Sequence, residues 1–376
     1  MTLRSRIIHS SRGAHAPSRV PVGASPTVSA PTAFPAGESQ RCEVAAGAPQ
    51  AAREARALPS GICEIAGLSR REFVIASTAS LCAIALRGVE AQNEPVMDIH
   101  QHTNYHGRSD DQLIAHQRAM GVSRTVLLPA GTPCERPSTH MGKSNGLAAQ
   151  CGGNQSCQEI AQQYPKEFLF GSNEVTDLPT ARQEIEKYLK AGARIIGEQK
   201  FGVDCDSKEF ELVAAVAQDY GVPILMHFQH ATYNMGIDRF QKVLEKFPEV
   251  NFIGHAQTWW GNIDAAHDQS VLYPKAKVKA GGLTDRLLSD YPNMFGDLSA
   301  GSGLNSMLRD EDHARGFLDR HQNKLMFGSD CADSAGSGLG CDGSQILAAI
   351  RRLAPNPKAV RKILFENAAR SLRIPG

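Results

Sequence analysis

Two histidines, His100 and His102, close an apolar run of the sequence, VMDIHQH. Because residues two apart on a β-strand face the same side, both imidazoles can bind one cation. Four more residues with ligand side chains close or follow other apolar runs: Glu198 in ARIIGE, His227 in PILMH, His255 in NFIGH and Asp330 after LMFGS. Imidazole and carboxylate groups together suit zinc, iron or manganese and leave positions open for water and substrate. The pattern predicts a centre of one or two divalent ions, with zinc preferred.

Such a centre would support hydrolysis. A bound divalent cation lowers the pKa of water from about 15.7 toward 7, which provides hydroxide at neutral pH. Asp330 can accept the proton of this water and pass it to the leaving group. His255 can stabilise the oxyanion that develops on an attacked carbonyl. The same residues would also serve a decarboxylase, in which Asp330 transfers a proton to the carbanion carbon.

These side chains need a scaffold that gathers the ends of several strands. Short apolar or β-branched runs predict eight strands, at 96–100, 124–129, 167–172, 193–198, 223–227, 251–255, 293–297 and 324–329. Helical patterns occur at 110–120, 180–191, 207–220, 236–247 and 311–321, with two more at 344–353 and 357–372. Eight βα units in about 280 residues fit an α/β fold, the (β/α)8 TIM barrel, whose active sites lie at the carboxyl ends of the strands. A doubly wound open sheet is the alternative, but the first strand is not followed by a Gly-rich phosphate fingerprint.

The combination of motifs resembles the amidohydrolase superfamily. The strings GEQKF, VPILMHF, FIGHAQTWWG and LMFGSDCAD are similar to its amidohydrolase-related branch (amidohydrolase family 2), over about residues 95–374. That branch includes metal-dependent hydrolases and aminocarboxymuconate-semialdehyde decarboxylase-like enzymes. The resemblance implies four metal ligands, which are His100, His102, His227 and Asp330. It also implies that Glu198 is a further or bridging ligand if two metals bind, and that His255 binds the second metal or polarises the substrate.

The resemblance leaves the reaction open between hydrolysis and decarboxylation. Decarboxylases of this branch commonly use one metal and lack the strand-four carboxylate, so Glu198 favours hydrolysis of an amide, lactone or ester. Lys200 lies on the same strand face and could instead hold Glu198 in a structural salt bridge. A third hypothesis is a barrel that binds a metal or small ligand without turnover. Asp330 argues against it, because a silent relative would be expected to have lost this acid.

Several residues near the motifs could contact a small-molecule substrate. Trp259 and Trp260 either wall the pocket or pack the loop after strand six. His230 and Lys200 could reach the mouth of the barrel.

The segment 262–284 is too long for an ordinary connection, which predicts a cap-like insertion after strand six that governs specificity. A Gly/Ser-rich segment at 333–343 is expected to form a flexible lip beside Asp330, while His106, His116 and His140 are expected to be solvated.

The cysteines give a weaker signal. Six follow residue 92, and an even number in an oxidising compartment permits disulfides. Local pairings of Cys151 with Cys157 and of Cys331 with Cys341 are the simplest, with free thiols as the alternative. The sequence contains no C-x-x-C motif, so it does not predict a zinc knuckle.

Two segments precede the predicted barrel. Residues 1–67 are rich in Ala, Pro, Ser, Gly and Arg with little apolar periodicity, which predicts a disordered extension. In residues 68–91, Arg70 and Arg71 precede the apolar run VIASTASLCAIAL, and VEA fits a cleavage site. We interpret this as a twin-arginine signal peptide, with a short buried helix as the alternative. The mature barrel at 92–376 would then be periplasmic or secreted, exported by the twin-arginine machinery.

The overall charge excludes some partners. Forty Lys and Arg against 39 Asp and Glu leave a net charge of +1, so no basic footprint for nucleic acid or an anionic membrane is present. The signal's apolar run is too short to span a bilayer, so no stable membrane anchor is expected. A homodimer is suggested only by analogy with other barrel enzymes.

Overall fold

The computed structural model describes residues 94–148 and 150–374. The extension at 1–67 and the signal at 68–91 lie outside these residues. Eight short strands follow one another along the described chain: β1 (Met97–Gln101), β2 (Arg124–Leu127), β3 (Phe168–Phe170), β4 (Ile196–Gln199), β5 (Ile224–His227), β6 (Phe252–His255), β7 (Met294–Asp297) and β8 (Leu325–Met326). Each lies within, or within one residue of, a run that predicted a strand.

The strands pair in parallel, each with the next along the chain. β1, β2 and β3 form one sheet, and β4 to β8 form another. A parallel bridge between Ser172 and Ile196 joins the two sheets on one side. On the other side, Ile99 N donates a hydrogen bond to Phe327 O at 3.1 Å, which links the β1 and β8 segments. This order, with each strand beside its successor, is that of a TIM barrel.

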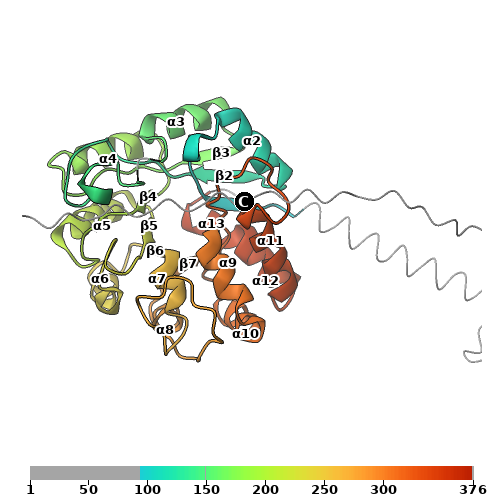
Figure 1. Ribbon diagram of the computed structural model, residues 1–376. Coiled ribbons are helices and arrows are strands. Elements are labelled where there is room, and N and C mark those ends of the chain that lie inside the picture. The colour runs from blue at the N-terminus through green and yellow to red at the C-terminus, as the bar shows by residue number, and fades with distance from the viewer. Residues whose placement is uncertain (1–93, 149, 375–376) are drawn as a thin grey trace, which may run out of the picture. The chain divides into compact units, whose positions relative to one another are not determined.

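Helices surround the strands (Figure 1). They are α2 (Asp110–Ala119), α3 (Asn154–Gln163), α4 (Ala181–Lys190), α5 (Lys208–Tyr220), α6 (Gln241–Lys246), α7 (Ala256–Gly261), α8 (Leu283–Asp290), α9 (Ala300–Leu308), α10 (Glu311–His321), α11 (Asp342–Leu353), α12 (Pro357–Arg361) and α13 (Asn367–Ser371). Short 3-10 turns occur at Tyr105–Gly107, His140–Gly142 and Ile237–Arg239, and a π-helical turn at Lys362–Glu366 joins α12 to α13. The helical patterns predicted from sequence did not include α3, α7, α8 or α9.

Local sequence explains where several helices begin and end. Ser109 caps α2 in a reciprocal capping box with Gln112, and Ser207 caps α5. Gly221 ends α5 in the left-handed region, with φ of 62°, where glycine avoids the steric cost of a side chain. These capping residues set where the helices begin and end. They therefore also set the bounds of the loops between helices and strands.

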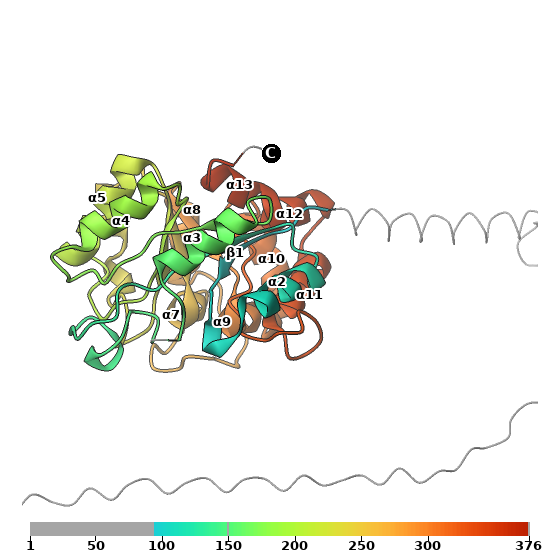
Figure 2. The same ribbon diagram turned by 90° about the horizontal axis from the view of Figure 1, so that it is seen from above.

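The core has two main parts. A large cluster packs the helices against the outer face of the strands. A smaller cluster takes side chains from most strands, among them Met97, Ile99, Leu225 and Phe295, and is continued by Ala368 of α13. Figure 2 shows α13 close to the segment that leads into β1. The interior of the barrel is therefore filled with side chains at this end, so the opposite ends of the strands are where a site can open.

The predicted insertion after strand six is an irregular segment between α7 and α8. It runs from Asn262 to Gly282 without regular secondary structure. His267 approaches Gly261 closely, since a Cβ added to that glycine would lie 2.3 Å from His267 Nε2. The insertion is thus folded back onto α7 beside the carboxyl end of β6.

Candidate metal centre

The structure brings six polar side chains together at the carboxyl ends of five strands. We call them the strand-end cluster: His100, His102, Glu198, His227, His255 and Asp330. Their side chains are buried except for that of Asp330, which is 11% exposed. Parallel strands of a barrel end at one face, so residues distant in sequence meet there.

A register shift in β1 aims two histidines at this cluster. The pairing of β1 with β2 shifts between Asp98 and Gln101, as at a β-bulge. Ile99 therefore lies in the inner apolar cluster while His100, the next residue, also faces the barrel interior. Gln101 then points away, to Ser329, and His102 faces inward again.

The hydrogen bonds of these two histidines leave their two Nε2 atoms facing each other. His100 Nδ1 lies 2.7 Å from Asp297 Oδ2, and His102 Nδ1 lies 2.8 Å from the Leu128 carbonyl oxygen. Both partners are acceptors, so each Nδ1 carries a proton and each Nε2 of a neutral ring carries a lone pair. The two Nε2 atoms are 3.2 Å apart. Burial lowers the pKa of both rings, but nearby acidic groups raise it overall, to about 10 for His102. The pair therefore attracts positive charge, which a divalent cation bound by both nitrogens would supply.

The two carboxylates point at the same place. Glu198 Oε2 lies 3.5 Å from both Nε2 atoms, and Asp330 Oδ1 lies 3.7 Å from His100 Nε2 and 3.5 Å from His102 Nε2. Asp330 Oδ1 is buried and accepts no hydrogen bond from the described residues. Two imidazole nitrogens and two carboxylate oxygens around one point form a donor set that fits a divalent metal.

Glu198 also faces a second pair of histidines. Its Oε1 lies 2.5 Å from His227 Nδ1 and 3.8 Å from His255 Nε2. The carboxylate thus lies between the pair from β1 and the pair from β5 and β6, as a bridging ligand would. Glu198 makes no ion pair with Lys200 within 4.0 Å, so the alternative of a direct salt bridge is not what the structure shows.

Charge in the cluster favours bound cations. Burial would raise the pKa of Glu198, but Lys200 and the neighbouring histidines hold it well below its usual range. Burial would also raise the pKa of Asp330, which the charge of His100 and two further histidines keeps well below its usual range. Burial and the charge of Lys200 lower the pKa of His227 to about 4. Both acids are therefore ionised and His227 is neutral at pH 7, the states in which they bind metal.

Asp297 supports the cluster, and sequence reasoning missed it. Its Oδ2 accepts from His100 Nδ1 and from Ser299 Oγ at 2.6 Å, and lies 3.3 Å from His255 Nδ1. Burial would raise the pKa of Asp297, but the hydrogen bonds with both histidines lower it. A carboxylate on the outer nitrogen of a ligating histidine fixes the tautomer that binds metal. The signal that could have revealed Asp297 is its place at the end of the seventh strand.

Two more side chains lie beside the cluster. The ring centroid of Tyr105 is 4.9 Å from that of His102, and the charge of Asp330 raises the pKa of the tyrosine, which keeps it a neutral donor. Lys200 lies with its ammonium 5.7 Å from the Tyr233 ring centroid. Burial would lower the pKa of Lys200, but Glu198 and Asp330 raise it. Lys200 therefore adds a positive charge beside the cluster.

The structure corrects or resolves several other expectations. Trp259 and Trp260 are buried in the apolar core, where Trp259 stacks on Phe228, so packing describes them better than a pocket wall. His116 is buried and not solvated, because α2 turns it inward against the segment after β8. His230 is exposed at the carboxyl end of β5.

The expected disulfides are absent from the structure. All six cysteines between Cys134 and Cys341 are free thiols. The sulfurs of Cys331 and Cys341 are 3.9 Å apart, too far for a bond of about 2.05 Å. The structure therefore has the alternative of free thiols, with Cys331 and Cys341 side by side but not bonded.

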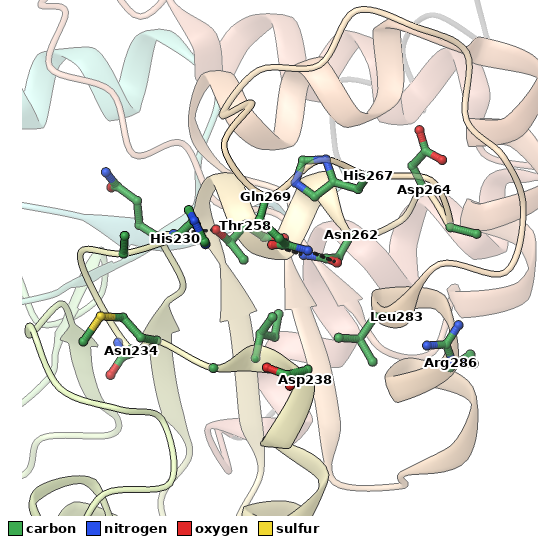
Figure 3. Close-up of a pocket in the computed structure, with 16 residues that line it drawn as sticks. His230, Asn234, Asp238, Thr258, Asn262, Asp264, His267, Gln269, Leu283 and Arg286 are labelled. Atoms are coloured by element: carbon green, nitrogen blue, oxygen red, sulfur yellow. Dashed lines mark hydrogen bonds between the residues drawn. The ribbon is translucent and has the colours of Figure 1, made fainter.

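A cavity of about 550 Å³ opens between the β5–α6 connection and the insertion after β6 (Figure 3). His230 and Asp238 line one side, and Asn262 and His267 line the other. Asn262, the C-terminal cap of α7, and Gln269 exchange hydrogen bonds of 3.1 and 2.8 Å, which hold the insertion against the end of that helix. The cavity also borders the cluster, because Gln229, a lining residue, has its Oε1 3.1 Å from His227 Nε2.

Several solved structures align with this chain. An uncharacterised TIM-barrel protein from Bordetella bronchiseptica aligns over 74% of this chain and 98% of its own, with 15% identity and a TM-score of 0.51. A 2,6-dihydroxybenzoate decarboxylase from Rhizobium aligns over 74% and 99%, with 13% identity and a TM-score of 0.48. A probable 2-pyrone-4,6-dicarboxylic acid hydrolase from Acinetobacter baumannii aligns over 74% and 99%, with 12% identity and a TM-score of 0.47. No curated protein sequence matches the chain significantly.

The sequence comparison with family models is more informative. The amidohydrolase model matches residues 97–374, which span all eight strands and every residue of the strand-end cluster. The match confirms the resemblance noted in the motifs, and the likeness to the Bordetella protein confirms the barrel. The chain belongs to the amidohydrolase family.

Proposed function

We propose that this amidohydrolase hydrolyses a carbonyl-type bond, an amide, lactone or ester, of a small molecule at the strand-end cluster. One observation carries the proposal: the Nε2 atoms of His100 and His102 face each other at 3.2 Å while both Nδ1 atoms are held by acceptors. With the carboxylates of Glu198 and Asp330 beside them, these nitrogens form a donor set that suits a shared divalent cation. The family and the donor set support a divalent metal.

We propose further that two zinc ions bind, with manganese or iron as alternatives. The first would be held by His100, His102 and Asp330, and the second by His227 and His255. Glu198 would bridge them, since its two oxygens face the two pairs of histidines separately. When bound, the ions act as Lewis acids and lower the pKa of water.

The chain's own residues would then move protons and orient the substrate. Asp330 faces the cluster with one oxygen free of hydrogen bonds, so it can accept the proton of the attacking water and return it to the leaving group. His255 offers only Nε2 to the cluster, so it cannot both bind a metal and donate to the substrate. If His255 is a ligand, Tyr105 is the neighbouring neutral group that can donate a hydrogen bond to a developing oxyanion.

A second candidate is decarboxylation, and Lys200 is the observation that favours it. The ammonium group of the partly buried Lys200, near Glu198 and Asp330, would hold a substrate carboxylate. Turnover in ¹⁸O-labelled water separates the two reactions. Hydrolysis places one ¹⁸O atom in the acid product, whereas decarboxylation releases carbon dioxide and leaves no label in the remaining product. Turnover of amides, lactones and esters without incorporation of label would refute the hydrolase.

We also propose export by the twin-arginine pathway to the periplasm or exterior. The motif Arg70-Arg71 before an apolar run supports this, although both lie outside the described residues. Among the helices that the structure describes, none has the length and apolar character needed to cross a membrane. We propose the export machinery as a partner, and a homodimer by analogy with other barrel enzymes.

A further inference from the structure

A second group of ligand side chains lies outside the strand-end cluster. We call it the thiol cluster: His116 of α2, Cys331 and Asp333 of the segment after β8, and Cys341 at the N-terminal cap of α11. His116 and both cysteines are buried, and the side chain of Asp333 is 20% exposed. The two clusters share no residue.

The distances within the thiol cluster match those of a tetrahedral zinc site. Zn–S bonds of about 2.3 Å and Zn–N bonds of about 2.0–2.1 Å place two sulfurs about 3.8 Å apart and a sulfur and a nitrogen about 3.5 Å apart. The Cys331 and Cys341 sulfurs are 3.9 Å apart, and they lie 3.4 and 3.5 Å from His116 Nε2. Asp333 Oδ2 lies 2.9 Å from the same nitrogen. All four atoms therefore surround one point.

Three ligand atoms converge on the same nitrogen. His116 Nε2 carries at most one hydrogen, so it can donate to only one of the three atoms that lie within 3.5 Å of it. Thiol, imidazole and carboxylate groups converge on one point here, and zinc binds all three kinds of group in their deprotonated forms.

We propose that His116, Cys331, Asp333 and Cys341 bind one zinc ion in a structural site. Two thiolates, one imidazole and one carboxylate complete four-coordinate zinc and leave no position for substrate. Arg108 donates to the carbonyl oxygens of Cys331 and Asp333 at 3.0 and 2.9 Å, which brings a positive charge beside the anionic ligands.

The position of this site explains what the ion would do. It ties α2, the segment after β8 and the start of α11 to one another, and Cys331 directly follows Asp330. The ion would therefore hold Asp330 in place against the strand-end cluster. No C-x-x-C motif reveals the site because its ligands come from three separate segments.

The test is the zinc content of the full chain and of two serine variants, measured by elemental mass spectrometry after purification with reductant. Cys341→Ser removes one ligand but keeps a good helix cap, because serine can accept the hydrogen bond from Ser344 N that Cys341 now accepts. Cys205→Ser is the matched control, since Cys205 is also buried and donates only to the Gly236 carbonyl. We expect Cys341→Ser to lose one equivalent of zinc and Cys205→Ser to lose none.

X-ray absorption at the zinc edge gives an independent readout on the unaltered chain. A shell of sulfur atoms at about 2.3 Å is expected, and it should weaken in Cys341→Ser but not in Cys151→Ser, which alters a thiol that interacts with His102. Equal zinc content in all variants, or no sulfur shell, would overturn the proposal. A disulfide between Cys331 and Cys341, seen as an intact mass two hydrogens lower than after reduction, would overturn it as well.

Discussion

Replacement of Asp297 by asparagine should weaken metal binding without removing any ligand. Both oxygens of the Asp297 carboxylate are acceptors: Oδ2 for His100 Nδ1 and Oδ1 for the Ser299 backbone N–H at 3.1 Å. An amide turned either way places its NH₂ group against one of these two donors. In one orientation the NH₂ group faces His100 Nδ1. The histidine proton would then move to Nε2, and the lone pair that binds metal would be lost.

The magnitude follows from the number of histidines that Asp297 supports. Loss of one such carboxylate costs about 10- to 100-fold in metal affinity, or about 1.4 to 2.8 kcal/mol. Because Asp297 faces both His100 and His255, we expect the upper end of this range. The assay is the apparent Kd for zinc, measured by competition with a chelator on the full chain.

Asp285→Asn is the matched control. Asp285 also holds a buried histidine, since its Oδ1 lies 2.5 Å from His321 Nε2, but it belongs to α8 and contacts no member of the strand-end cluster. The Asp285→Asn variant should be less stable than the unaltered chain, but its strand-end cluster should bind zinc with unchanged affinity. An Asp297→Asn variant with unchanged affinity would refute the argument that Asp297 sets the tautomer of His100.

Three further predictions concern the cluster and the signal. Asp330→Asn should reduce turnover by about 10²-fold or more with little change in Tm, since a positioned acid or base contributes about 10²- to 10⁴-fold; an active variant would remove Asp330 from the mechanism. His100→Ala combined with His102→Ala should yield a folded chain whose strand-end cluster has lost its metal, as judged by circular dichroism and elemental analysis. Full metal content would contradict the ligand assignment. Arg70→Lys with Arg71→Lys should keep the protein in the cytoplasm on fractionation, and continued export would show that the motif is not the signal.

The strand-end residues could be predicted because barrel geometry links sequence position to space. An apolar run of four to six residues that ends in His, Glu or Asp marks both a strand and its carboxyl end. His227 and His255 illustrate this, since they are paired directly in the register of β5 and β6. Such a signal needs no knowledge of distant contacts.

Other features depend on contacts that no local pattern encodes. The bulge in β1 places Ile99 and His100 on the same side of the strand, against the simple alternation that a sequence predicts. His116 looks like a surface residue of a polar helix, but the segment after β8 covers it. Trp259 follows the predicted ligand His255 closely in sequence, but the chain turns into α7 after His255, and the tryptophan side chain packs in the core.

The central claim is that cations bind between the histidines of the strand-end cluster, and anomalous diffraction at the zinc edge tests it most directly. Crystals of the full chain grown with zinc should show a strong peak between His100, His102 and Asp330, and a second beyond Glu198 beside His227 and His255. A peak at Cys331 and Cys341 would show in the same map that zinc was available. Such a peak with no density between His100 and His102 would contradict the account.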